Sequence, residues 1–126
     1  MRDGAPPALT VLSEEEQAFR ETVQKLSREK IAPLVRSMDA ASHMEPSVIK
    51  ALFENGLMGV DVDPKYGGTG ATFTTSIIVI EELAKVDASV SVLCDVQNRT
   101  FSQAVLQFTN EEQRTKNLPL LCKTTV

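Results

Sequence analysis

Apolar residues first recur at helical spacing between residues 13 and 38, with polar residues at the positions between them. Ser13 followed by Glu16 has the spacing of a capping box, in which each side chain satisfies a free amide of the first turn. Pro33 lies inside the pattern and lacks a backbone donor, so it predicts a bend near Ile31–Ala32. We therefore expect one bent helix over residues 13–38. Its stripe consists of Phe19, Val23, Leu26, Ile31, Leu34, Val35 and Met38.

A second, shorter helix is predicted to begin at Pro46, because proline suits a first turn whose amide has no intrahelical partner. Asn55 and Gly56 provide a left-handed stop for this helix. Leu57, just beyond the stop, is well placed for the hydrophobic contact that often accompanies such a cap. The apolar face between these signals consists of Val48, Ile49, Leu52 and Phe53.

Glycine and proline are concentrated in residues 59–71, so we expect no regular element there. A third helix is predicted over residues 73–86, and it is apolar nearly all round, which is typical of a buried helix. Its β-branched run would also suit a strand, but its length and the segment Glu81–Lys85 favour a helix. The apolar positions are Ile77, Ile78, Val79, Ile80 and Leu83.

Asp87 is placed to cap a fourth helix over residues 88–98. Phe101, Val105 and Leu106 indicate a further helical segment, and we expect a break in the helix between the two. The apolar residues of the fourth helix are Val90, Val92, Leu93 and Val96.

Thr109 and Glu112 repeat the spacing of a capping box, so a last short helix is predicted to run toward Leu118–Pro119. Helices packed on helices are the only architecture that these patterns support. The predicted fold class is therefore all-α, a small up-and-down helical bundle. The predicted organisation is a flexible segment at residues 1–12, a helical domain at 13–121 and a tail at 122–126.

Length, composition and charge limit the classes of protein to which this chain could belong. A chain of 126 residues fits one domain, and its 42% apolar residues, with no tryptophan, predict a thin core that leaves open a need for a partner. A net charge of −4 argues against a nucleic-acid binder, which needs a basic patch. Apolar runs are too short to span a membrane. Residues 1–7 lack the pattern of a secretory signal or transit peptide, so such a segment either does not exist or has been removed.

The loop Pro64–Gly70 is the most conspicuous candidate for chemistry, because backbone amides of glycine-rich loops can bind phosphate. It lacks the spacing of the known phosphate-binding glycine motifs, so we favour a structural loop that lets two helices approach closely. Glu81 and Glu82 are adjacent and point roughly 100° apart on a helix, so we expect a solvated edge rather than a shared acid–base site. Asp61 and Asp63 are interpreted as surface and turn groups.

Cys94 and Cys122 have no histidine or second cysteine at metal-ligand spacing, and we expect two free thiols and no metal site. Ser91 and Asp95 share one face of an otherwise apolar helix. Such a pair either completes hydrogen bonds inside the core or lines a cleft where it contacts a ligand, and the residues alone favour the first. The sequence shows no catalytic triad or dyad, so no catalytic residue is assigned.

The order of several segments resembles the N-terminal domain of the acyl-CoA dehydrogenase family, and most of all its short/branched-chain members. No segment is specific alone, but five in the same order are, and the resemblance covers about residues 13–121. The segments are Ile31–Val35, Leu52–Val60, Pro64–Gly70, Ile80–Ser89, and Glu111–Gln113 before Leu118–Pro119. The segment Arg99–Gln103 departs from the apolar pattern of the family, so we expect the packing of the helix after Asn98 to differ.

The resemblance implies a function. Members of the family oxidise acyl-CoA thioesters between the α and β carbons: a glutamate takes the α proton and FAD accepts the β hydride. Electrons pass to electron-transfer flavoprotein, the enzymes form homotetramers, and in eukaryotes they work largely in the mitochondrial matrix. The flavin contacts and the catalytic base lie mainly in a middle β-domain and a C-terminal domain. We therefore expect this chain alone to hold no FAD and to be inactive.

The helix over residues 88–98 resembles the one that lines the acyl-chain pocket of the family. The resemblance thus assigns Ser91, Val92 and Asp95 as substrate-binding residues, with no cofactor-binding residue assigned. The alternative function is a non-catalytic helical module, whose exposed apolar faces associate with another copy or with full-length subunits.

Overall fold

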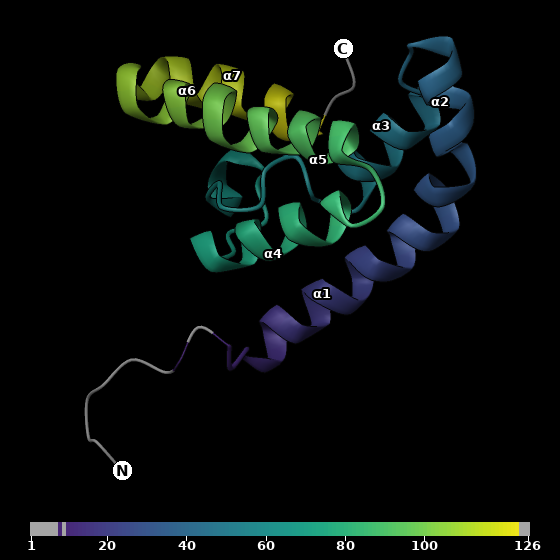
Figure 1. The fold of residues 1–126 in the computed structure, drawn as a ribbon. Helices are drawn as coiled ribbons and strands as arrows, with labels where there is room; N and C mark the ends of the chain where they lie inside the picture. Colours follow the sequence, from purple (N-terminus) through teal and green to yellow (C-terminus); the bar gives the residue numbers. More distant parts are fainter. Residues whose placement is uncertain (1–7, 9, 124–126) are drawn as a thin grey trace.

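The computed structural model describes residue 8 and residues 10–123, and every regular element in that part of the chain is helical. Figure 1 shows α4 lying between α1 and the long rod that begins at α5. The prediction of an all-α bundle is confirmed. The elements are α1 Glu14–Leu26, η1 Ser27–Ile31, η2 Ala32–Leu34, α2 Val35–Ala41, α3 Pro46–Glu54, η3 Pro64–Tyr66, α4 Phe73–Ala84, α5 Ala88–Asp95, η4 Val96–Ser102, α6 Gln103–Phe108 and α7 Glu111–Lys123.

The first helix begins and bends where the sequence predicts. The amide of Ser13 donates to Glu16 Oε2 at 2.8 Å, and the Glu16 amide donates to Ser13 Oγ at 3.1 Å, which completes the capping box. The bend follows from Pro33, because the chain passes from the π-helix η1 into the 3₁₀-helix η2 around this residue. The helix then resumes as α2 and ends at Ser42, whose φ of 50° is left-handed.

The stop after α3 is also confirmed. Gly56 has a φ of 70°, in the left-handed region that favours glycine. The Leu57 amide donates to the carbonyl of Leu52 at 3.0 Å and the Gly56 amide donates to that of Phe53 at 3.0 Å, which is the Schellman pattern. Leu57 is fully buried, as its predicted contact requires. The cap therefore turns the chain sharply into the glycine-rich loop.

Two predictions for the C-terminal half of the chain are wrong: the break after Asn98 and the first residue of the last cap. The helices α5, η4 and α6 form one continuous rod. No break follows Asn98, because the helix continues through the seven-residue π-helix η4 into α6. The last helix is capped one residue later than predicted: Asn110 and Gln113 exchange the two capping-box hydrogen bonds, in place of Thr109 and Glu112. Both pairs have the spacing of a capping box. Thr109 is the C-cap of α6, and the box that starts α7 is formed from Asn110.

Most buried apolar side chains belong to one core between α1, α3, α4 and α5, and a smaller cluster joins the loop to α7. Ile77 is 43% exposed, so the prediction that α4 is buried all round is wrong on that face. The fully buried apolar residues of the main core include Val23, Leu52, Leu57, Val60, Val79, Leu83, Val90 and Cys94. The smaller cluster consists of Val62, Tyr66, Leu118 and Cys122.

Glu82 overturns the expected solvated pair, because only Glu81 is exposed. The Glu82 carboxylate is 2% exposed and binds Lys85 Nζ at 2.7 Å. It also lies 3.3 Å from Arg20 Nε and accepts a hydrogen bond of 3.1 Å from Gln24, both of which belong to α1. Burial opposes its ionisation, but these hydrogen bonds and nearby positive charges outweigh it and lower the pKa of Glu82. The carboxylate thus ties α1 to α4.

Replacing Glu82 with glutamine should lower the free energy of unfolding at neutral pH by about 1–3 kcal/mol, because a buried charged acceptor is lost. The lowered pKa means that this stabilisation is complete above the ordinary pKa of a glutamic acid and disappears as the pH falls through the folded value. Urea unfolding of both proteins as a function of pH measures the difference, which should shrink in acid. The exposed neighbour is the control, and Glu81→Gln should change stability by no more than about 0.5 kcal/mol. Equal effects of the two substitutions would contradict the role of Glu82.

The expected terminal segments lie largely outside the described residues. Of the segment 1–12, residues 1–7 and 9 are not described, and of the tail 122–126 only Cys122 and Lys123 are, at the end of α7. The boundaries of these segments therefore stay predictions. In the described part of the chain, every helix is too short or too polar to cross a membrane.

Candidate functional site

The three residues assigned to the substrate lie on α5 but in different surroundings. Ser91 is buried, and its hydroxyl donates to the carbonyl of Ile80 on α4 at 2.8 Å. Val92 points outward and is 60% exposed, while Asp95 is half-buried. Ser91 therefore holds α5 against α4, and Val92 presents an apolar surface beyond the bundle. A role for the three residues in substrate binding stays a prediction.

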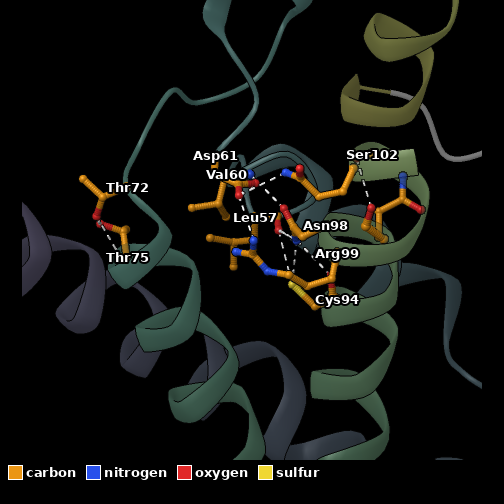
Figure 2. A network of polar contacts seen from close by, with 11 residues as sticks. Leu57, Val60, Asp61, Thr72, Thr75, Cys94, Asn98, Arg99 and Ser102 are labelled. Carbon is orange, nitrogen blue, oxygen red and sulfur yellow. Dashed lines mark hydrogen bonds and ion pairs between the residues drawn. The ribbon is translucent and has the colours of Figure 1, made fainter. Parts of the chain in front are cut away.

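Asn98 fixes the next turn of the same rod. Its Oδ1 accepts from the Val60 amide at 2.9 Å, and its Nδ2 donates to the carbonyls of Leu57 and Cys94, each at 2.8 Å. Figure 2 shows the amide lying between the helix and the segment that follows α3. Asn98 is 1% exposed, so all three bonds form away from water. The asparagine thereby sets the height and rotation of the rod relative to the loop.

Arg99 forms a second polar contact beside this one. Its Nη1 lies 2.9 Å from Asp61 Oδ2, and its guanidinium stacks over the ring of Phe73 at 4.4 Å from the centroid. Gln103 donates to the same Asp61 oxygen at 3.3 Å. Asp61 is therefore a largely covered ion-pair partner, 12% exposed, and its interpretation as a simple surface group is wrong. Arg99 and Gln103, the first and last residues of the segment that departs from the family's pattern, thus both bind this carboxylate.

The glycine-rich loop uses its own amides. Each amide from Lys65 to Ala71 donates to an oxygen atom of the protein, either the Asp63 side chain or a backbone carbonyl. The segment after Gly68 thereby folds back onto residues 59–62, and a Cβ at Gly68 would collide with the Val62 carbonyl. These amides therefore all have partners within the protein, which favours the structural interpretation of the loop over a phosphate site. The expectation that it holds no regular element is wrong for one turn, the 3₁₀-helix η3.

Both thiols are buried. Cys94 is fully buried, and its Sγ donates to the Leu57 carbonyl. Burial is the main cause that raises the pKa of Cys94 to about 12. Burial also raises the pKa of Cys122. Both are free, as predicted, and no group of three or more metal-ligating side chains occurs among the described residues.

A shallow cavity of about 290 Å³ lies between the end of α2 and the start of α5. Its polar groups include His43 and Asp87, but Asp87 Oδ1 already accepts from the amides of Ser89 and Val90. The Asp87 side chain thus caps the start of α5 through the amides of Ser89 and Val90. The cavity is lined by Met38, Asp39, Ser42, His43, Met44, Asp87 and Ser89.

Comparison with known proteins decides the family. The family model of the acyl-CoA dehydrogenase N-terminal domain matches residues 13–125. The chain belongs to the acyl-CoA dehydrogenase family. It is 48% identical to the mitochondrial short/branched chain specific acyl-CoA dehydrogenase of Bos taurus, over 94% of this chain and 28% of that protein. The chain thus spans less than a third of the length of this relative.

Solved structures of the family agree with the fold. The butyryl-CoA dehydrogenase of Megasphaera elsdenii superposes with a TM-score of 0.84 at 28% identity, covering 90% of this chain and 30% of that one. A glutaryl-CoA dehydrogenase of Mycobacterium smegmatis in complex with FADH2 superposes with a TM-score of 0.82 over 88% of this chain and 28% of that one. The identity of the second is 21%, so it supports the fold alone. The bundle is therefore an acyl-CoA dehydrogenase N-terminal domain in structure as well as in sequence.

Proposed function

We propose that this chain forms one wall of the acyl pocket in a FAD-dependent dehydrogenase of short or branched-chain acyl-CoA thioesters. The observation that supports the pocket wall is the outward position of Val92 on a helix whose opposite side is fixed. Ser91 binds α4 and Asn98 binds the segment after α3, so Val92 is held in place by two buried polar contacts. An apolar side chain held at a surface in this way suits contact with an acyl chain.

The chemistry of the reaction has to come from outside the described residues. Their loop amides are all used, and they form no group that would hold the phosphates of a flavin dinucleotide. FAD supplies the hydride acceptor in this chemistry, and a base must be held against the α carbon of the substrate. We assign both to polypeptide equivalent to the remaining length of the relatives. The roles left to this chain are to exclude water and to position the acyl chain.

Purified alone, the chain should retain no flavin and should not reduce a redox dye with a short branched acyl-CoA as substrate. The reason is that we assign both the flavin site and the base to polypeptide beyond this chain. The absorbance spectrum after gel filtration in the presence of FAD measures the first, and dye bleaching measures the second. Stoichiometric flavin together with substrate-dependent bleaching would contradict this division of roles.

The family also suggests the setting of the reaction. We propose electron-transfer flavoprotein as the electron acceptor, a homotetramer as the assembly, and the mitochondrial matrix as the location. The last rests on the bovine relative, which is described as mitochondrial. Entry of the substrate through branched-chain amino-acid or fatty-acid catabolism follows from the same relationship.

A further inference from the structure

The stop at the end of α3 contains an asparagine followed directly by a glycine. Asparagine is a thermolabile residue, because its side-chain amide can react with the backbone nitrogen that follows it. Glycine has no Cβ, so in an open chain nothing shields its nitrogen from this reaction. Asn55 is exposed and is the single asparagine of the chain that precedes a glycine, since the others precede arginine, glutamate or leucine.

The reaction available to this pair is a deamidation that consumes one water molecule. The Gly56 nitrogen attacks Cγ of Asn55, a C–N bond forms, and the side-chain nitrogen leaves as ammonia with the proton of the Gly56 amide. Water then opens the resulting cyclic imide at either of its carbonyls. The product is an aspartate, or an isoaspartate in which the backbone runs through the former side chain. Neither an oxidant nor a second protein is required.

The native stop keeps the reacting groups occupied and apart. The Gly56 amide donates to the Phe53 carbonyl at 3.0 Å, and Asn55 Nδ2 donates to the Ala51 carbonyl at 2.8 Å. Asn55 has a ψ of 8°, which turns its Cβ away from the Gly56 nitrogen about the Cα–C bond, whereas ring closure needs the two atoms eclipsed. The chain therefore has to open locally at this stop before the nitrogen can reach Cγ.

The glycine-rich loop holds the stop closed. Thr69 Oγ1 donates to the Gly56 carbonyl at 2.8 Å, and the next residue, Leu57, is fully buried in the main core. Contacts of this kind determine how often a segment opens. We propose that Asn55 is a site of spontaneous deamidation, and that the contact between Thr69 and the stop controls its rate.

The products do not rebuild the stop. An aspartate at this position lacks the donor that now binds the Ala51 carbonyl, and its negative charge lies at the C-terminal end of α3, next to Glu54. An isoaspartate adds a carbon to the backbone and shifts the Gly56 and Leu57 amides away from the carbonyls that they bind. The modification is thus one-way and releases the loop from α3. This inference goes beyond the proposed function, because neither an acyl chain nor a flavin takes part.

Ageing of the purified chain at mildly alkaline pH, in buffer and in concentrated urea, tests the site. Trypsin releases residues 51–65 as one peptide, in which Asn55 is the single asparagine, and its mass reports the exchange of an amide for a carboxylate. Deamidation of this peptide should be at least about tenfold faster in urea than in buffer, because only the open stop reacts. Absence of the product in urea, or equal rates in the two solvents, would overturn the proposal.

Thr69→Val tests the control by the loop, because it removes the hydroxyl that binds the Gly56 carbonyl and leaves the reacting residues in place. The rate in buffer should rise by about twofold to tenfold, the range expected for the loss of one hydrogen bond, and the rate in urea should not change. Ser37→Ala is the matched control, since the Ser37 hydroxyl donates to the Leu34 carbonyl at 2.9 Å, away from α3. If both variants deamidate in buffer at the same rate, the loop does not control the site.

Asn55→Asp reproduces one product and tests its consequence. The Leu57 amide, which now donates to the Leu52 carbonyl, should exchange with deuterium at least about tenfold faster in this variant. Asn117→Asp is the control, because Asn117 also donates to the carbonyl four residues earlier in its helix. Exchange of the Leu57 amide at the same rate in both variants would contradict the release of the loop.

Discussion

Replacing Asn98 with alanine should lower the free energy of unfolding by about 3 kcal/mol or more, because several buried polar groups lose their partners. The Val60 amide and the Leu57 carbonyl would be left without the bonds that the asparagine side chain now makes. Domains are stabilised by only about 5–15 kcal/mol, so a loss of this size should lower the melting temperature by about 10 °C or more. Thermal and urea unfolding monitored by circular dichroism measure the change.

The chain contains a matched control for this substitution. Asn117 also donates from its Nδ2 to the carbonyl four residues earlier in its helix, but that bond is exposed. Asn117→Ala should therefore change stability by only about 0.5 kcal/mol. If both alanine variants unfold at the same denaturant concentration, the buried network does not hold the rod.

Asn98→Asp separates the two halves of the network. The aspartate keeps an acceptor for the Val60 amide, but as a carboxylate it lacks a donor for the two carbonyls and adds a buried charge. Burial raises the pKa of such a carboxyl, so this variant should regain stability as the pH falls and the protonated form donates again. Loss of stability in acid equal to that of the wild type would contradict this account.

Local signals in the sequence were sufficient to predict where several helices begin, bend or end. The Ser13 box, the bend at Pro33 and the stop at Gly56 were all predicted, because each depends on backbone chemistry within a few residues. The choice between Thr109 and Asn110 as the last cap was missed. Both fit the same spacing, and only the packing of α6 against α7 distinguishes them.

Long-range contacts account for the other errors. Adjacent helical residues point in different directions, but the sequence does not show which of Glu81 and Glu82 faces α1, because Arg20 lies more than sixty residues away. Asp61 was interpreted as a surface group for the same reason, since its partner Arg99 is on the rod. A buried charge next to an opposite charge distant in sequence leaves no local pattern.

The candidate site could be predicted only by resemblance. Spacing alone placed Ser91 and Asp95 on one face, and it left open whether that face was core or cleft. The structure shows that Ser91 is buried and Val92 is exposed. Because the helix has apolar residues along most of its length, the sequence did not show which side faces the core. Asn98 was missed entirely, although an asparagine in an otherwise apolar helix is a signal that a buried polar contact is present.

A chimeric enzyme would test by its activity whether this chain can form one wall of the acyl pocket. The bovine short/branched chain enzyme would have its corresponding segment replaced by residues 13–121 of this chain. Because 48% of the aligned residues are identical, the bundle should dock in place of the original. The chimera should retain bound flavin, and its kcat/KM for a short branched acyl-CoA should lie within about tenfold of the parent value.

Within the chimera, Val92→Phe should lower kcat/KM by about tenfold, mainly by raising KM, because the larger ring occupies space proposed for the acyl chain. Leu120→Phe adds a ring at an exposed position of α7 and should leave both constants unchanged. The activity of the unmodified chimera is the most direct test of the central claim, that this bundle is a working N-terminal domain of an acyl-CoA dehydrogenase. Oxidation of the branched acyl-CoA near the parental rate is the predicted result. A folded, flavin-bound chimera that oxidises no acyl-CoA would contradict it.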